Sequence, residues 1–323
     1  ALFLSYFDYQ VYTKFWPVIA VFCVIIMLVL FKWGTGPSSR PDARTWLSIG
    51  PINFQPSELV KIGFIITFGV HLDKVKEKIN NIFSILQLGA HAAVPIVLVA
   101  ATGDMGSALV FMVIAIVMMF VAGVHWGYFL GGIALVGAAT PLIWTYVLKQ
   151  LQKDRFLALI YPDLYPDIIY QQQRGLNAIG AGGITGQGLF KGAYTQAGAV
   201  PESQNDMIFS VVGEELGFIG CITALLLIVL ITVRIIYVGK KSSEQSTNLI
   251  CTGMAAMIIG QMIINVGMCL MLLPVIGITL PFFSAGGSSN LCVYLGIGIV
   301  MSIYRHNCDT GAVNIRVYDS LKK

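Results

Sequence analysis

Charged residues are scarce in this sequence. Asp, Glu, Lys and Arg make up only 11% of its 323 residues, whereas a soluble domain carries about 25%. Hydrophobic residues account for 56%, and the mean hydropathy is +0.79. This composition excludes a soluble globular domain, and a net charge of +4 is too small for a nucleic-acid-binding surface. We predict an integral membrane protein that binds no nucleic acid.

Cysteine and histidine are also rare, and neither forms a recognisable site. The six cysteines include no CxxC pair, which argues against a disulfide framework or a zinc site. We interpret them as small buried hydrophobic residues. Of the four histidines, His91 lies within an apolar run and is interpreted as a packing residue. The cysteines and histidines therefore indicate no cofactor. The sequence leaves open whether a divalent cation assists the chemistry.

Uniformly apolar runs take up most of the chain. We count eight of them as helices that cross a bilayer, of which the second is short for such a helix. The pattern predicts an all-α polytopic membrane protein, a helical bundle that forms a single membrane domain over residues 1–323. The runs lie at 15–33, 58–71, 82–101, 106–123, 127–148, 207–238, 248–273 and 288–304.

The basic residues predict how the spans are oriented, because cytoplasmic loops are enriched in Lys and Arg. Basic residues cluster at 74–78, at 234–241 and in the tail at 305–323. With eight spans, these segments lie on one side of the membrane, which is then the cytoplasmic side. The segments 34–57 and 149–206 are placed outside.

The two long outer segments differ from ordinary connections. Residues 34–57 contain four prolines, and residues 149–206 form a large extracytoplasmic loop that is too long for a passive connection. Apolar and aromatic residues in this loop indicate an interfacial helix near 151–161 or 167–179. The glycines of 180–188 suit a flexible turn better than a phosphate cradle, although both are open.

Several polar residues stand near the ends of the apolar runs. Glu58 and Lys61 are three residues apart and therefore share a helical face. They form an ion pair at the helix start or, with Arg44 and Trp46, a site for a phosphate or a sugar. Asp104 lies between two runs, where it caps the next helix or belongs to a site.

A broken apolar run follows near the C-terminus. Residues 273–289 contain two prolines and three glycines. Irregular backbone at membrane depth is tolerated only where protein buries it or where it lines a cavity. Asn265, in the preceding run, is a candidate polar partner for that cavity.

Residues 201–218 are the most informative stretch. They place Asp206 where a polar loop meets an apolar run, with Glu214 and Glu215 inside the run. A charge at membrane depth costs about 2.5–3.5 kcal/mol on insertion scales, so these residues are expected to have a use. On a helix that starts near Asp206, Glu214 and Gly217 share one side. Asp206 is a helix cap or a site residue, and each glutamate is a site residue or a buried structural support.

Six of these segments together resemble one known family. In order, they closely resemble the SEDS family of bacterial cell-wall polymerases, the shape, elongation, division and sporulation proteins. The resemblance implies a fold of about ten spans, which this sequence matches from the third span onward. The matching segments are ARTW at 43–46, FQPSELVK at 54–61, GDMGSAL at 103–109, AIGAGGITGQGL at 178–189, PESQNDMIFSVVGEELGF at 201–218 and LLPVIGITLPFFSAGGSS at 272–289.

The resemblance implies a peptidoglycan glycosyltransferase that polymerises lipid II on the outer face of the bacterial cytoplasmic membrane. Asp206 matches the essential aspartate of the family, which takes the proton from the 4-hydroxyl of the acceptor sugar. Arg44 and Lys61 are expected to neutralise the diphosphate, with Glu58 orienting Lys61. Glu214, Glu215 and Asn265 are expected to support the structure. The remaining residues of the implied substrate-binding set are Trp46, Gln55, Asp104, Glu202 and Ser288.

The implied partners are a class B penicillin-binding transpeptidase and the elongation machinery. The sequence around Asp206 resembles that of the elongation (RodA-type) branch more than that of the division (FtsW-type) or sporulation branches. A flippase that moves lipid-linked sugars is the alternative, because intramembrane carboxylates and broken helices also suit a transporter. The charged motifs cluster on the outer side, which favours the polymerase. A scaffold that only docks a transpeptidase leaves Asp206 unexplained.

Overall fold

The computed structural model describes residues 1–36, 43–50 and 52–320. Three prolines of the predicted outer segment, Pro37, Pro41 and Pro51, lie outside the described residues, as does 321–323 of the predicted tail. The chain divides into two compact units. Unit 1 comprises Ala1–Gly123, Leu230–Ile259 and Gly287–Lys323, and unit 2 comprises Val124–Val229 and Gly260–Gly286.

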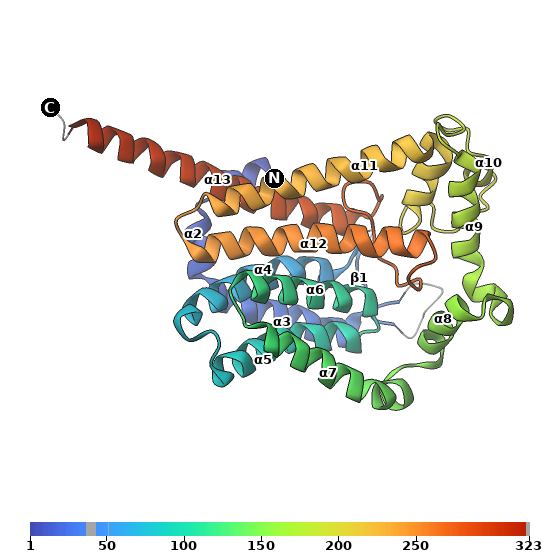
Figure 1. Cartoon of the computed structure of the whole chain (residues 1–323), viewed down its shortest axis with the longest axis horizontal. Coiled ribbons are helices and arrows are strands. Elements are labelled where there is room, and N and C mark those ends of the chain that lie inside the picture. The colour runs from blue at the N-terminus through green and yellow to red at the C-terminus, as the bar shows by residue number, and fades with distance from the viewer. Residues whose placement is uncertain (37–42, 51, 321–323) are drawn as a thin grey trace. The chain divides into compact units, whose positions relative to one another are not determined.

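Unit 1 is a helical bundle with a small hairpin at one end. In Figure 1, α3, α4, α5 and α6 run side by side within it. Its elements are α1 (Leu2–Ser5), α2 (Tyr9–Lys14), α3 (Trp16–Trp33), β1 (Leu47–Ile49), β2 (Ile52–Phe54), α4 (Pro56–Lys74), the 3-10 turn Lys76–Lys78, α5 (Ile82–Ala101), α6 (Met105–Val121) and α13 (Gly287–Ser320), together with the adjoining ends of α11 (Ile208–Lys240) and α12 (Gln245–Cys269).

Helix α4 is the central element of unit 1. Almost all of its side chains are buried, and it packs against α3, α5, α6 and α13. Glycines allow close packing with α12, since an added Cβ at Gly69 would lie 3.0 Å from Ile250, and one at Gly253 would lie 2.6 Å from Ile65. The polar residues at the start of α4 are therefore enclosed by protein.

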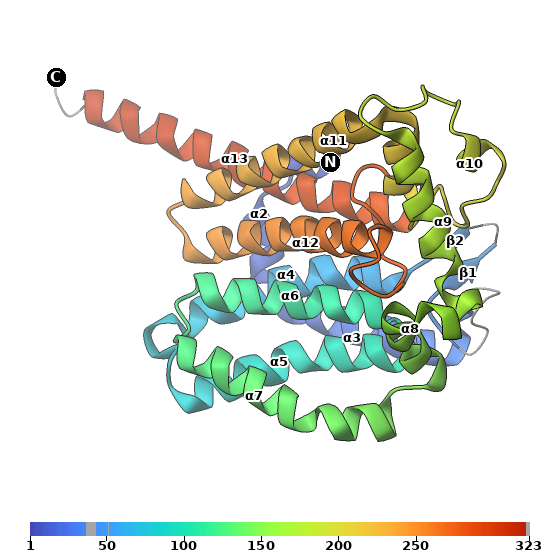
Figure 2. The same ribbon diagram turned by 45° about the vertical axis from the view of Figure 1, so that its right-hand side comes forward.

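The hairpin is a feature that the sequence did not predict. Strands β1 and β2 pair antiparallel, with Leu47 opposite Phe54. Gly50, in the turn after β1, has a φ of 62°, a left-handed conformation that glycine adopts without strain. In Figure 2 the hairpin projects past the ends of α3 and α4.

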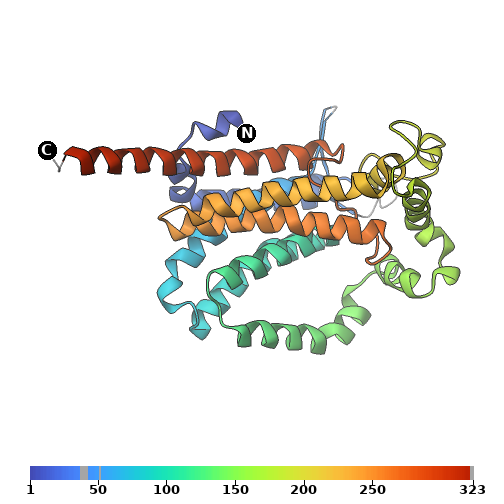
Figure 3. The same cartoon turned by 45° about the horizontal axis from the view of Figure 1, so that its top comes forward.

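Unit 2 contains the large loop and the segments that border it. In Figure 3, α9 and α10 lie against the beginning of α11. The unit comprises α7 (Trp126–Leu142), the π-helical turn Ile143–Val147, α8 (Gln150–Ile160), the 3-10 turn Pro162–Leu164, α9 (Pro166–Gly182), α10 (Ala193–Gln196), the first part of α11 and the last part of α12.

The helices confirm the predicted all-α membrane fold. Each of the eight apolar runs forms a helix, and six of the described helices are long and apolar enough to cross a membrane. Of the other two, α6 has 17 residues, and α4 carries charged residues. The large loop contains a helix at each predicted place, α8 and α9. The predicted tail from residue 305 continues α13 as far as Ser320.

Candidate functional site

The segment that enters the hairpin positions Arg44 and Trp46. Trp46 forms an antiparallel bridge with Thr35, and the Arg44 backbone N–H donates to the Thr102 carbonyl at 2.8 Å. The guanidinium of Arg44 donates to the Phe31 carbonyl near the end of α3. Arg44 is exposed and Trp46 is half-buried, so this segment presents a cation and an aromatic ring at the end of unit 1.

Asp104 is a buried hydrogen-bond hub at the same end of unit 1. Its Oδ1 accepts the Ser107 backbone N–H at 3.0 Å, which caps α6. Its Oδ2 accepts from the Gln55 Nε2 at 2.8 Å and from the Ser57 hydroxyl at 3.0 Å. The capping interpretation of Asp104 is confirmed, and the same carboxylate also ties α6 to the start of α4.

Ser288 joins this cluster from the start of α13. Its Oγ accepts the backbone N–H of Gln55 at 3.1 Å and donates to the Asn53 carbonyl at 3.4 Å. Three residues distant in sequence, Gln55, Asp104 and Ser288, are therefore brought together within unit 1.

Glu58 and Lys61 form the predicted ion pair, and it is buried. The Lys61 Nζ lies 2.7 Å from the Glu58 Oε1. The Glu58 side chain is 6% exposed and the Lys61 side chain is 0% exposed. A pair removed from water keeps its attraction but loses hydration, so each charge depends on its partner.

In unit 2, Asp206 lies in a turn just before α11. The turn contains Glu202, which is exposed and has a φ of 51°. The Glu202 carbonyl accepts the backbone N–H of Met207 at 3.1 Å, and its Oε2 accepts the Asn205 Nδ2 at 2.8 Å. Asp206 itself is half-buried. The turn thus places a carboxylate at the boundary between a polar loop and an apolar helix.

Two other segments hold this turn by its backbone. The Asn265 Nδ2 donates to the carbonyls of Asp206, at 2.8 Å, and Ile278, at 2.7 Å. The Ser284 hydroxyl donates to the Asn205 carbonyl at 2.8 Å, and the Ala285 N–H donates to the Gln204 carbonyl at 2.8 Å. Asn265 therefore binds the broken run at Ile278 and also holds the Asp206 turn.

The two glutamates of α11 bind the backbone of the large loop. Glu214 is fully buried and accepts from Tyr194 N at 2.6 Å, from Thr195 N at 3.0 Å and from the Thr195 hydroxyl at 2.5 Å. Glu215 accepts from Phe190 N at 2.9 Å. Each carboxylate therefore holds a separate part of the loop.

A break at Gly217 corrects the predicted continuous helix. Gly217 has φ 66° and ψ −166°, so it does not continue the helical face of Glu214. The carbonyls of Glu214 and Glu215 accept instead from Gln187 N and Gly188 N, each at 3.0 Å. The glycine-rich segment is therefore a turn packed on α11, and these two N–H groups are occupied by protein.

Sequence reasoning missed two side chains that brace the broken run from the large loop. The Gln172 Nε2 donates to the carbonyls of Met268 and Leu273, each at 2.8 Å, and the Arg155 guanidinium donates to the Val275 carbonyl at 2.7 Å. The only sequence signal is that a buried glutamine lies among apolar residues of an amphipathic helix, which is too common to identify a brace.

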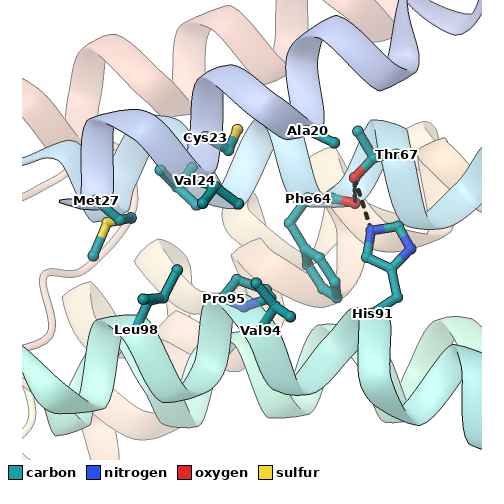
Figure 4. Close-up of a pocket in the computed structure, with 11 residues that line it drawn as sticks. Ala20, Cys23, Val24, Met27, Phe64, Thr67, His91, Val94, Pro95 and Leu98 are labelled. Carbon is teal, nitrogen blue, oxygen red and sulfur yellow. Dashed lines mark hydrogen bonds between the residues drawn. The ribbon is translucent and has the colours of Figure 1, made fainter.

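A cavity of about 150 Å³ lies between α3, α4 and α5 of unit 1 and contains none of the predicted site residues. At one end of it, the His91 Nε2 lies 3.2 Å from the Thr67 hydroxyl (Figure 4). The His91 Nδ1 lies 2.9 Å from the Nδ1 of His71. His91 is thus a hydrogen-bonded packing residue, as predicted. Among the described residues, no group of three His, Cys, Asp or Glu side chains could hold a metal ion.

Comparisons with known proteins agree on one family. The family model described as cell cycle protein, FtsW/RodA/SpoVE, matches residues 1–309. The peptidoglycan glycosyltransferase MrdB of Escherichia coli K12 is 29% identical over 300 residues, which cover 92% of this chain and 80% of that protein. The probable peptidoglycan glycosyltransferase FtsW of Geobacter sp. M18 is 32% identical over 303 residues, which cover 92% and 80%.

Solved structures show the same fold. A chain from a study of how a peptidoglycan synthase complex coordinates polymerization and crosslinking matches with a TM-score of 0.80 and 26% identity, covering 94% of this chain and 85% of that one. The rod shape determining protein RodA of Thermus thermophilus matches with a TM-score of 0.69 and 24% identity, covering 94% and 82%.

Proposed function

Because the chain belongs to the FtsW/RodA/SpoVE family of cell cycle proteins, we propose that it is a peptidoglycan glycosyltransferase with Asp206 as its general base. The membership confirms the resemblance inferred from the motifs. One observation carries the proposal for Asp206: the turn that holds this half-buried carboxylate is fixed by hydrogen bonds to three successive carbonyls, those of Gln204, Asn205 and Asp206.

In the proposed reaction, Asp206 accepts the proton of the 4-hydroxyl on the acceptor sugar. The oxygen forms a bond to the anomeric carbon of the growing chain as the bond from that carbon to the lipid diphosphate breaks, and the diphosphate leaves as an anion. A base placed within hydrogen-bond reach of the hydroxyl contributes typically about 10²–10⁴-fold to the rate. The substrate that supplies the acceptor sugar is lipid II.

The bracing of the turn supports this role. A base is effective only when its geometry is set before the reaction, and residues whose neighbours are locked by hydrogen bonds need little reorganisation. Asn265 and Ser284 provide that lock for the Asp206 turn. We assign them a positioning role, together with Glu214 and Glu215, which hold the large loop against the start of α11.

Arg44 and Lys61 are proposed to neutralise the diphosphate, as cationic groups do for other phosphate leaving groups. The exposed guanidinium of Arg44 is available to an anion without a change in its backbone. Lys61 is fully buried against Glu58, so its role requires it to exchange the Glu58 carboxylate for a diphosphate oxygen. Glu58 then holds Lys61 until substrate arrives.

The other proposed substrate contacts divide into two groups. Gln55, Asp104 and Ser288 bind one another, which supports action through the shape of the cluster. Trp46 and Glu202 are at least partly exposed and suit direct contact with a sugar or peptide. We propose an active site on the outer membrane face, a class B penicillin-binding transpeptidase as partner and membership of the elongation branch.

The test of the base is polymerisation of purified lipid II by the chain with its transpeptidase partner. We expect Asp206→Asn and Asp206→Ala to lower the rate by at least about 10²-fold, because the proton acceptor is removed. Asp163→Asn is the matched control, since Asp163 is an exposed carboxylate in the same large loop. Full polymerisation by Asp206→Asn would rule out the general-base assignment.

A further inference from the structure

A groove lies between α11 and α13 of unit 1, near the basic end of α11 and beside the middle of α13. It encloses about 480 Å³. Ile235 and Val238 form its buried floor, whereas the wall residues Leu230 and Ile231 are exposed. On helices that cross a membrane, an exposed apolar groove of this kind faces lipid chains.

One cation lies within this apolar groove. Arg234 is six residues before the end of α11 at Lys240, a separation of about 9 Å along a helix. Its Cζ lies 5.2 Å from the ring centroid of Tyr237 and 5.5 Å from that of Tyr304. Stacking on a ring uses the face of a guanidinium and leaves its in-plane N–H donors for an anion. In the described part of the chain, Arg234 forms no ion pair.

Further positive charge adjoins the groove where α11 ends. The Lys241 Nζ lies 4.8 Å from the ring centroid of Tyr237, and Lys240 is exposed. The next acidic residue along the chain, Glu244, interacts with Tyr9 of α2. Tyrosines and basic residues at this position are typical of the level of lipid head groups. The groove therefore combines apolar walls with a basic, aromatic end.

We propose that this groove binds an anionic phospholipid of the leaflet on the basic side of the membrane, which is predicted to be cytoplasmic. The lipid phosphate lies against the N–H donors of Arg234, with Lys240 and Lys241 adding charge. One acyl chain lies between Ile231 of α11 and Met301 of α13. Basic pockets between membrane helices on the cytoplasmic side bind anionic head groups in this way.

The apolar walls and the basic end of the groove together favour an anionic lipid over other ligands. A free phosphate ion would use the cations and leave the apolar walls exposed. A zwitterionic lipid such as phosphatidylcholine carries its own cation beside its phosphate and so gains less from Arg234, Lys240 and Lys241. Charge complementarity therefore favours an anionic lipid.

The experiment uses the full chain, purified in an uncharged detergent and titrated with phosphatidylglycerol or phosphatidylcholine. Native mass spectrometry measures the lipid retained on the protein. We expect the chain to retain phosphatidylglycerol in preference to phosphatidylcholine. Arg234→Gln should weaken retention of phosphatidylglycerol about fivefold, the effect of one cation near a lipid surface. Met301→Trp, which fills the groove, should reduce retention at least as much.

The matched control is Lys76→Gln, which removes an exposed cation on the same predicted side of the membrane but outside the groove. It should retain phosphatidylglycerol like the unchanged chain. Equal losses in Lys76→Gln and Arg234→Gln would show diffuse attraction and overturn the proposal. Equal retention of the two lipids, or a dimer that forms without retained lipid, would also overturn it. Unfolding midpoints in uncharged detergent confirm that the variants are folded, and none of the readouts needs catalytic activity.

Discussion

At the scale of single residues, two ion pairs with the same spacing lie in opposite surroundings. Glu58 and Lys61 are 6% and 0% exposed and pair at 2.7 Å. Asp73 and Lys76 are 28% and 47% exposed and pair at 3.0 Å. The distances are similar, so any difference in stability between the pairs comes from burial.

Removing one partner of the buried pair should be costly. Lys61→Met leaves the Glu58 carboxylate buried without its cation, and we expect a loss of about 3–5 kcal/mol in the free energy of unfolding. Lys76→Met leaves Asp73 in water and should cost about 1 kcal/mol or less. Unfolding in mixed micelles with a denaturing detergent measures both.

The double variant Glu58→Gln/Lys61→Met provides the check on this account. It removes both charges, so part of the loss should be recovered. Equal, small losses for the two lysine variants would contradict the buried pairing. The sequence predicted this pair from its spacing but not its burial, because α4 is enclosed by several other helices, among them α13, which starts more than two hundred residues further along the chain.

At the scale of elements, the break in α11 is the main departure from the expected structure. Gly217 lies within a uniformly apolar run, which locally predicts an uninterrupted helix. The groups that stabilise the break come from Gly183–Gly188, some thirty residues earlier in the chain. The residues of the run do not indicate that a segment so far away in the sequence pairs with them, so the break could not be predicted.

We expect Gly217→Ala to destabilise the protein strongly. Its φ of 66° and ψ of −166° fall in a region that only glycine populates readily. Holding another residue in this conformation costs about 1–3 kcal/mol. An added Cβ would also lie 2.3 Å from the Gly186 nitrogen. The loss should appear in the free energy of unfolding and as faster hydrogen exchange at Phe218 and Ile219, whose N–H groups donate to the segment.

Gly132→Ala is the control for this change. Gly132 lies inside helix α7, and an added Cβ would meet no atom within 4 Å. Alanine is the better helix former by about 1 kcal/mol, so this variant should be neutral or more stable. A neutral Gly217→Ala would mean that α11 continues through residue 217 and would contradict the described break.

At the scale of the whole molecule, the eight apolar helices were predictable because a membrane helix satisfies its own backbone hydrogen bonds within one segment. The hairpin was not predictable, because the pairing of its two strands depends on the turn between them and not on a long pattern of apolar residues. The site divides in the same way. Asp206, Glu58 and Asp104 stood out as charges at run ends. The sequence does not reveal that Gln172 binds a backbone carbonyl or that the backbone N–H of Thr195 donates to Glu214.

The orientation of the chain is open to a direct measurement. In a Cys308→Ser background, Asp163→Cys and Lys76→Cys each place an exposed thiol on a segment predicted to lie outside or inside, respectively. We expect a membrane-impermeant maleimide to label Asp163→Cys in intact cells and Lys76→Cys only after permeabilisation, because the basic loops stay cytoplasmic. The reverse pattern would invert the topology and move the large loop to the cytoplasm.

The pairing of the glycine turn with α11 also restricts how this protein can change over evolutionary time. Four backbone hydrogen bonds link residues 183–188 to residues 214–219 one by one. Inserting or deleting a single residue in the turn would shift every one of these partners at once. The length of this turn should therefore be inherited almost unchanged, while exposed parts of the same loop are free to lengthen or shorten.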